Sequence, residues 1–168
     1  MTHALHDDWW SSLIRVDMSV RPASPSDCDQ LARMRHALWA DSTAEEHARE
    51  LIAILEGQAS SPSPTVTLVA EAGDQKLLGF LEAGLRSHAD GCDPSHPVGF
   101  IEGWYVAENH RQQGVGGKLL AAAEEWARVH GCVEMASDTW IGNEISQRVH
   151  EALGYEVVDR CVHYRKTL

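Results

Sequence analysis

Residues 99–120 read GFIEGWYVAENHRQQGVGGKLL, and they join a strand, a glycine-rich bend and the start of a helix. Apolar residues from Phe100 to Val106 favour the strand, and Glu102 is an acidic interruption within it. The bend, residues 111–118, lacks side chains where a ligand would approach, and it leaves the first amides of the helix free to bind an anion. The pattern predicts a phosphate-binding loop, with a glycine-rich turn that binds no ligand as the alternative.

Two common phosphate-binding motifs do not fit this bend. Walker A needs a glycine where the chain has Gln112 and a Ser or Thr where it has Leu119, and Leu119 also stands at the last glycine of the dinucleotide fingerprint. The pattern that fits is Arg-x-x-Gly-x-Gly, at Arg111, Gly114 and Gly116, after a strand that contains a carboxylate. This pattern resembles the acyl-coenzyme A pyrophosphate loop of the GNAT superfamily of N-acetyltransferases.

Length and composition indicate one soluble domain, residues 1–168, in which residues 1–12 are a peripheral extension. Hydrophobic residues make up 43% and charged residues 23% of the chain, as in ordinary globular proteins. Neither a signal peptide nor a membrane span is visible, so we expect a cytoplasmic protein with no membrane partner. The four cysteines lack a C-x-x-C pair and the ten histidines lack H-E-x-x-H, so we expect no metal.

The formal charge of -11 argues against a nucleic-acid surface, which would need clustered Lys and Arg. A negative charge favours a cationic small-molecule substrate instead, although acidity can also serve solubility alone.

The expected elements alternate between strands and helices. The first strand is residues 13–21, and the first helix begins at Ser24–Asp27 and ends at Trp39. A capping box at Thr43–Glu46 begins the second helix, which stops at Gly57. The later elements are strands at residues 65–71, 77–85 and 99–106, a helix at 116–130, a strand at 132–137, a helix at 143–153 and a final strand at 155–165 with a bulge.

This order predicts a mixed α/β (α+β) fold with a mostly antiparallel central sheet flanked by about four helices. GNAT domains have the same order of elements, so the resemblance extends from about residue 14 to the C-terminus.

Three stretches are similar to the cytoplasmic, single-domain aminoglycoside 6'-N-acetyltransferases: residues 100–103, 134–139 and 163–166. The resemblance implies direct transfer of acetyl from acetyl-CoA to the 6'-amine of an aminoglycoside antibiotic, antibiotic resistance, and a homodimer. The antibiotic site implied by those relatives corresponds to Trp39, Glu102, Asp138 and Asp159. Two features depart from the relatives: residues 88–91 contain no aromatic residue to cover the drug, and the N-terminal extension is additional.

Physical reasoning supports the acidic residues independently, because each ammonium group of an aminated sugar prefers a charged oxygen acceptor. Each acid also has a purely structural alternative. Glu102 could pair with an arginine, Asp138 could cap a turn, and Asp159 could lie on a solvated face. Glu102 or Asp138 is also the candidate base, yet a neighbouring acid raises the pKa of the amine and opposes its deprotonation. A purely binding role for these acids therefore stays open.

The coenzyme is expected on the strand and the loop, with the carbonyl of its thioester polarised by an amide near Val106. His150 stands where many GNAT members have the tyrosine that protonates the leaving thiolate, so it is the candidate general acid, with packing on a helix face as the alternative. Asn143 opens the same helix, where capping is a sufficient explanation. The expected coenzyme-binding residues are Trp104, Tyr105, Val106, Arg111, Gln112, Gln113, Gly114, Val115, Gly116, Gly117, Lys118 and Asn143.

Two alternative functions remain at this point. One keeps the fold and takes a polyamine, a small metabolite amine or a protein amine as substrate. The other is a non-catalytic coenzyme A-binding module, which only His150 in place of tyrosine favours.

Overall fold

Five strands form one sheet in the order of the sequence, β1-β2-β3-β4-β5. The computed structural model describes residues 17–58 and 62–167. Its strands are β1 (Met18–Pro22), β2 (Thr65–Ala72), β3 (Leu77–Arg86), β4 (Val98–Val106) and β5 (Glu134–Ser137). Its helices are α1 (Cys28–Leu38), α2 (Ala44–Leu55), α3 (Val115–Val129) and α4 (Glu144–Ala152), with short 3-10 helices η2 (Pro25–Asp27) and η3 (Glu108–His110).

The first four strands are antiparallel to their neighbours, and β5 is parallel to β4. A parallel pair needs a crossover, which α3 supplies between β4 and β5. The predicted mixed, mostly antiparallel sheet is therefore confirmed.

The helix starts follow the capping signals in the sequence. Ser24 and Asp27 form a capping box in front of α1, with Pro25 at the first position of η2. Thr43 accepts a hydrogen bond from the Glu46 amide at the start of α2, and the Glu46 carboxylate accepts one from the Thr43 amide. Each box satisfies amides that a helix start would otherwise leave without partners.

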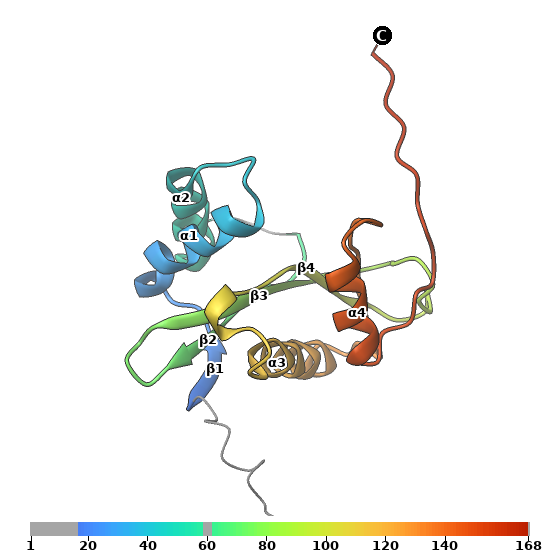
Figure 1. Cartoon of the computed structure of the whole chain (residues 1–168). Coiled ribbons are helices and arrows are strands. Elements are labelled where there is room, and N and C mark those ends of the chain that lie inside the picture. The colour runs from blue at the N-terminus through green and yellow to red at the C-terminus, as the bar shows by residue number, and fades with distance from the viewer. Residues whose placement is uncertain (1–16, 59–61, 168) are drawn as a thin grey trace, which may run out of the picture.

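The helices cover both faces of the sheet, α1 and α2 on one and α3 on the other (Figure 1). Under α1 and α2, the core holds Phe80 together with Leu31 and Leu51, which are fully buried. Against α3, the core is built around Leu81 and Leu119. Both layers pack against β3. The next strand in the sheet, β4, lies between this core and the functional residues.

The predicted final strand, residues 155–165, is wrong. In the described part of the chain, no residue after Ala152 belongs to a helix or strand. The C-terminal tail (residues 156–167) is an extended segment that leaves the rest of the molecule (Figure 1). Its composition favours a strand, but a strand also needs a neighbour to pair with, and this chain places none beside it.

Two other predicted strand boundaries differ slightly. The described part of the first strand begins at Met18 rather than earlier, and residues 13–16 of that prediction lie outside the described residues. The fifth strand begins at Glu134 instead of Cys132. The predicted peripheral extension, residues 1–12, also lies outside them.

Candidate functional site

A β-bulge places Glu102 at the surface of β4. Glu82 of β3 pairs with Gly103, whereas the next residue, Ala83, pairs with Ile101, so Glu102 is an extra residue in β4. A bulge changes the direction of side chains and is often found beside an active site. Here it explains how an acid stands in an otherwise buried strand.

The Glu102 carboxylate is held by Arg86 at the end of β3. The Arg86 guanidinium donates to both carboxylate oxygens, with its closest nitrogen 2.8 Å from Oε2. Arg86 also lies over the ring of Phe100, 3.3 Å from its centroid. Both charged side chains are partly exposed, so the pair can exchange its partners for a cationic ligand.

Trp39 lies directly against β4 at the level of Gly103. A Cβ at Gly103 would overlap the Trp39 ring, so only glycine allows this contact. The tryptophan ends α1, packs against Phe80 and His47, and has Arg35 over its ring at 5.3 Å. The structure thus brings Trp39 next to the bulge that carries Glu102.

A second acid, Glu82, lies largely buried in this region, and the sequence did not reveal it. Its carboxylate Oε1 is 3.3 Å from Nε of Arg35, and both side chains are largely buried. Burial raises the pKa of the Glu82 carboxyl, and the nearby Arg35 charge partly opposes that rise. Neither Nε of Arg35 nor Oε1 of Glu82 makes a well-aligned hydrogen bond, so both atoms retain capacity for a polar ligand.

Strands β4 and β5 part immediately before the two candidate acids. Their parallel pairing ends at Ile101 and Ser137, so Glu102 and Asp138 are the next residues along two neighbouring strands. Asp138 is exposed there. The two acids therefore stand at the same level of the sheet, on two neighbouring strands.

Beyond this point, β4 has an edge that β5 does not cover. The amide of Ala107 donates to the carbonyl of Leu78 in β3, and backbone groups alternate sides along a strand. The amide of Val106 therefore points away from β3, and its carbonyl accepts a hydrogen bond from Nε of Arg111 at 3.0 Å. An extended ligand can lie along this edge as an added strand.

The glycine loop delivers backbone amides to the start of α3. Gly114 is the N-cap, with φ 80°, and no side chain caps the helix there. A Cβ at Gly114 would meet open space, and one at Gly117 would meet only Leu153 at 3.9 Å. Gln112 also has a positive φ, 60°, which is uncommon for a residue with a side chain and gives the loop its tight bend. This open, uncapped start of a 15-residue helix suits an anion such as a phosphate.

The sequence model of the acetyltransferase (GNAT) family matches residues 31–155. The chain belongs to this family. The match begins within α1 and includes every later element up to α4, with the glycine loop and the parted strands.

Known GNAT relatives are similar in sequence to this chain over most of its length. The aminoglycoside N(6')-acetyltransferase type 1 of Klebsiella aerogenes is 42% identical over 89% of this chain and 96% of its own length. A protein of the same name from Serratia marcescens is 43% identical over 83% of this chain and 92% of its own length.

Solved structures of relatives share the fold. The structure of AAC(6')-Iy with the bisubstrate analogue CoA-S-monomethyl-acetylneamine has a TM-score of 0.78 at 36% identity, covering 90% of this chain and 99% of the other. AAC(6')-Ih from Acinetobacter baumannii, an aminoglycoside 6'-N-acetyltransferase, has a TM-score of 0.79 at 30% identity with the same coverage.

His150, where many GNAT members have tyrosine, lies across the parting of β4 and β5. Its Nδ1 is 2.8 Å from the carbonyl oxygen of Ser146, so Nδ1 donates, and its Nε2 is 3.0 Å from Oγ of Ser137. In the neutral ring, Nε2 therefore accepts from the Ser137 hydroxyl. Ser137, which directly precedes Asp138, is a further candidate that the sequence alone did not indicate.

Trp104 and Tyr155 sandwich the ring of His150. Both meet it edge-on, at centroid distances of 5.5 and 5.4 Å. Trp104 Nε1 and the Tyr155 hydroxyl are buried without a hydrogen-bond partner, and burial raises the pKa of the Tyr155 phenol. The Trp104 ring also lies against Gly116, so this polar but unsatisfied cluster adjoins the glycine loop.

The remaining predicted residues have local contacts. Asn143 caps α4 by accepting a hydrogen bond from the Ser146 amide at 3.1 Å, and this capping role is sufficient to explain it. Asp159 lies on the C-terminal tail, where it accepts from the amide of its neighbour Arg160. Within one chain, the contacts of Asp159 do not join it to Glu102 and Asp138.

No group of three or more His, Cys, Asp or Glu is arranged to hold a metal ion in residues 17–58 and 62–167. In the same part of the chain, no helix is both long and apolar enough to cross a membrane.

Proposed function

We propose that this chain transfers the acetyl group of acetyl-CoA to the 6'-amine of aminoglycoside antibiotics and thereby confers resistance to them. The observation that carries the proposal is the parting of β4 and β5, which sets Glu102 and Asp138 at one level beside an open strand edge and an uncapped glycine loop. The names of the relatives and the bisubstrate complex of AAC(6')-Iy support the choice of both substrates.

In the proposed reaction, the chain binds acetyl-CoA along β4 and α3. The amides at the start of α3 hold the pyrophosphate, and the pantetheine arm pairs with the uncovered edge of β4. The amide of Val106, which points to that edge, donates to the carbonyl oxygen of the thioester as negative charge develops there.

The aminoglycoside binds through its ammonium groups to acids beside the bulge. Glu102 and Asp138 are the proposed acceptors, Trp39 supplies an apolar wall, and Glu82 lies behind it as a third carboxylate. A cationic ligand that binds Glu102 replaces Arg86 as the partner of the carboxylate, so binding exchanges one cation for another.

Proton transfer accompanies the attack of the amine on the thioester carbon. The new C–N bond forms, the C–S bond breaks, and the amine gives up one proton to Glu102, Asp138 or water. The sulfur leaves as a thiolate and takes the proton of the Ser137 hydroxyl, while His150, in its imidazolium form, passes its Nε2 proton to the Ser137 oxygen. His150 is then neutral and takes up a new proton from solvent, since it is only half-buried.

The remaining expectations about the setting of the reaction are also proposals. We place the enzyme in the cytoplasm, where acetyl-CoA is made, and we expect it to act as a homodimer without a nucleic-acid or membrane partner. Its net charge of -11 is consistent with a cationic small-molecule substrate.

The test follows the free thiol released from acetyl-CoA with two matched aminoglycosides, one carrying a 6'-amine and the other a 6'-hydroxyl. Release with the amine alone is the expected result. Release with neither, while acetyl-CoA binding is measurable by calorimetry, overturns the antibiotic proposal. Polyamines and lysine peptides would then be tried in the same assay, and release with none of them would indicate a binding module.

A further inference from the structure

Two arginines pair with acids on one face of the sheet, and the two pairs differ in their exposure. Glu82 and Arg86 stand an even number of positions apart on β3, so their side chains point to the same face, the one covered by α1 and α2. The pair of Arg35 and Glu82 is enclosed, with side-chain exposures of 11% and 14%, whereas Arg86 and Glu102 are both 42% exposed. The second pair is therefore the one that a ligand can reach.

Phe100 gives the Arg86 side chain a second contact besides Glu102. Gly84 precedes Arg86 on the same face of β3 and pairs with Phe100 across the strands, so no side chain stands between them there. The Arg86 guanidinium lies 3.3 Å from the centroid of the Phe100 ring, a cation–π contact. Phe100 is buried in a small core cluster, so its ring is a fixed platform. Arg86 can give up the carboxylate and still stay beside it.

Binding of the amine to Glu102 alone would hinder its acetylation. A carboxylate beside an ammonium group favours the charged form and raises the pKa of the amine, whereas only the uncharged amine has a lone pair with which to attack the thioester. A positive charge beside the same group has the opposite effect, because two like charges a few ångströms apart disfavour the charged form. A site that binds an amine through an acid and then acetylates it gains from a cation next to that acid.

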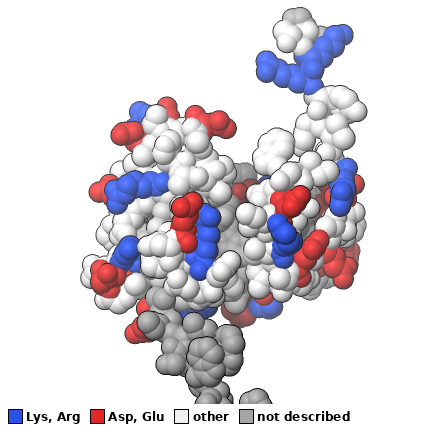
Figure 2. Space-filling model, in the orientation of Figure 1, with Lys and Arg blue, Asp and Glu red and all other residues white. Residues whose placement is uncertain are grey.

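The exchange of partners at Glu102 supplies such a cation. In the free protein the Arg86 guanidinium donates to both oxygens of Glu102, so an incoming ammonium group has to take at least one oxygen from it. Phe100 then keeps the guanidinium beside the carboxylate, and the two cations become neighbours on one acid. Figure 2 shows basic side chains of the body beside acidic ones, so an arginine that shares its acid with a second cation is a distinct feature of the liganded site.

The other charged groups around Glu102 do not take this part. The charged and titratable groups on the elements packed around it are Glu82 on β3, Arg35 on α1, His47 and Glu50 on α2, Asp138 after β5, and His88 and Asp90 on the loop after β3. Arg35 is enclosed with its acid partners, and the exposed His88 lies beside Asp90. Arg86 is thus the permanent cation that a ligand meets at Glu102.

We propose that Arg86 activates the amine of the substrate: it shares Glu102 with the ammonium group, and its positive charge favours loss of the proton that the amine must give up before it attacks. The proton passes to the base or to water, the C–N bond then forms, and Arg86 itself neither gains nor loses a proton. This inference rests on the proposed function, since it needs a reacting amine at Glu102.

The first test follows thiol release in a single turnover, with protein in excess over acetyl-CoA and a saturating aminoglycoside, from about pH 6 to about pH 10. Arg86→Gln should slow the reaction about 3- to 10-fold near neutral pH, because loss of one positive charge beside a partly exposed amine raises its pKa by about 1 at most. The loss should disappear at high pH, where the amine is uncharged in both proteins. Arg86→Lys, which keeps the charge, should match the unaltered chain.

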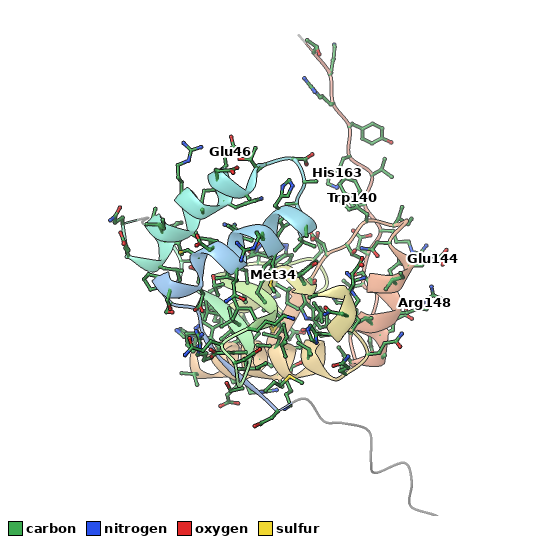
Figure 3. All side chains as sticks on the ribbon, turned by 60° about the vertical axis from the view of Figure 1, so that its left-hand side comes forward. Met34, Glu46, Trp140, Glu144, Arg148 and His163 are labelled. Carbon is green, nitrogen blue, oxygen red and sulfur yellow. The ribbon has the colours of Figure 1, made fainter. Side chains whose placement is uncertain are left out.

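Arg148→Gln is the matched control, because Arg148 pairs with an acid, Glu144, on the outer side of α4, as Figure 3 shows. It should leave the rate unchanged at every pH. A loss in Arg86→Gln that is equal at all pH values overturns the proposal, since Arg86 would then only orient Glu102. An unchanged rate in Arg86→Gln, or a loss in Arg86→Lys as large as in Arg86→Gln, overturns it as well.

A second measurement counts the protons released on binding and needs no acetyl transfer. The chain with coenzyme A bound is titrated with the aminoglycoside by calorimetry, in two buffers of different ionisation enthalpy at about pH 8. The unaltered chain should release more protons than Arg86→Gln, because its bound amine is less often charged. Equal proton release by the two proteins overturns the proposal, even if acetyl transfer takes place.

The two measurements also separate this proposal from the proposed function. The expected difference in protons without any thiol release would discard the acetyl transfer and keep the role of Arg86. A chain that binds no aminoglycoside would fail the proposed function, and the same titration with the polyamine spermidine would then decide the role of Arg86, equal proton release again overturning it.

Discussion

The body of the molecule (residues 18–137) and its C-terminal region (residues 138–167) differ in how they meet solvent. Every buried hydrophobic residue in the described chain lies in the body, from Cys28 to Cys132. The C-terminal region instead contains nine large exposed hydrophobic residues. A single copy therefore completes the core of the body by itself, whereas the apolar surface of the C-terminal region is left exposed to solvent.

The largest effect expected from this comparison is on the body core. Phe80 is fully buried between Trp39 and Tyr105, so Phe80→Ala should lower the free energy of unfolding by about 3–5 kcal/mol. Urea denaturation followed by circular dichroism measures it. Leu153→Ala in the C-terminal region should cost much less, because Leu153 is 40% exposed. An equal loss for both substitutions would show that the two regions are packed alike.

Glu102→Gln probes the border between the regions, where β4 parts from β5. Loss of the charge should lower kcat/KM for the aminoglycoside about 10- to 100-fold, because a charged hydrogen bond contributes about 1.5–3 kcal/mol. A rise in KM at constant kcat would make Glu102 a clamp, and a fall in kcat would make it the base. Glu125→Gln is the control, since Glu125 also pairs with an arginine, Arg128, but on α3. A Glu102→Gln enzyme with unchanged kcat/KM would remove this residue from the site.

Acid should weaken the body through Asp27, which is buried beside Arg21. Hydrogen bonds from the Arg21 guanidinium, at 2.7 and 2.9 Å, are the main cause that lowers the Asp27 pKa from 3.8 to about 2. The folded pKa is the lower one, so the ion pair stabilises the fold above about pH 4, and this stability is lost as pH falls toward 2.

The Asp27 contribution is about 2 kcal/mol at neutral pH. Asp27→Asn should remove it and flatten the unfolding free energy between pH 4 and 2, as measured by urea titrations at each pH. Arg21→Gln should flatten the same window. If Arg21→Gln leaves the slope unchanged, another group causes the acid sensitivity.

Two glycines at opposite ends of α3 have similar backbone conformations, so substituting each of them tests the phosphate loop against a matched control. Gly114 and Gly131 have φ of 80° and 83°, and a Cβ at either would meet open space. Alanine at each should therefore cost a similar ~1 kcal/mol of stability. Only Gly114→Ala should also weaken acetyl-CoA binding, by several-fold in calorimetry, because only Gly114 lies at the uncapped start of the helix. Equal binding by both variants would place the phosphates elsewhere.

Much of the body could be predicted because its signals are local. The capping boxes at Ser24 and Thr43, the hairpin between β2 and β3 and the glycine loop each depend on residues within a few positions of one another. These features fix helix starts and turns whatever the rest of the chain does.

The bulge at Glu102 and the burial of Glu82 could not be predicted in this way. The bulge depends on the register between β3 and β4, and the burial of Glu82 depends on Arg35, 47 positions earlier in the chain. The prediction of a final strand was wrong for a related reason, since a sequence indicates that a segment can pair but not which edge it pairs with. The structure places Glu102, Asp138 and His150 around the point where β4 and β5 part, whereas the contacts of Asp159 on the tail do not join it to them.

Asp159→Asn gives the smallest expected effect and connects the tail to the site. If Asp159 binds an ammonium group of the aminoglycoside as proposed, its loss should raise KM for the aminoglycoside about 2- to 5-fold, because an exposed charge contributes at most about 1 kcal/mol. Steady-state kinetics measure the change. Glu156→Gln is the control, since Glu156 is an exposed acid on the same tail. An equal rise in KM for both variants, or no rise for Asp159→Asn, would remove Asp159 from the substrate site.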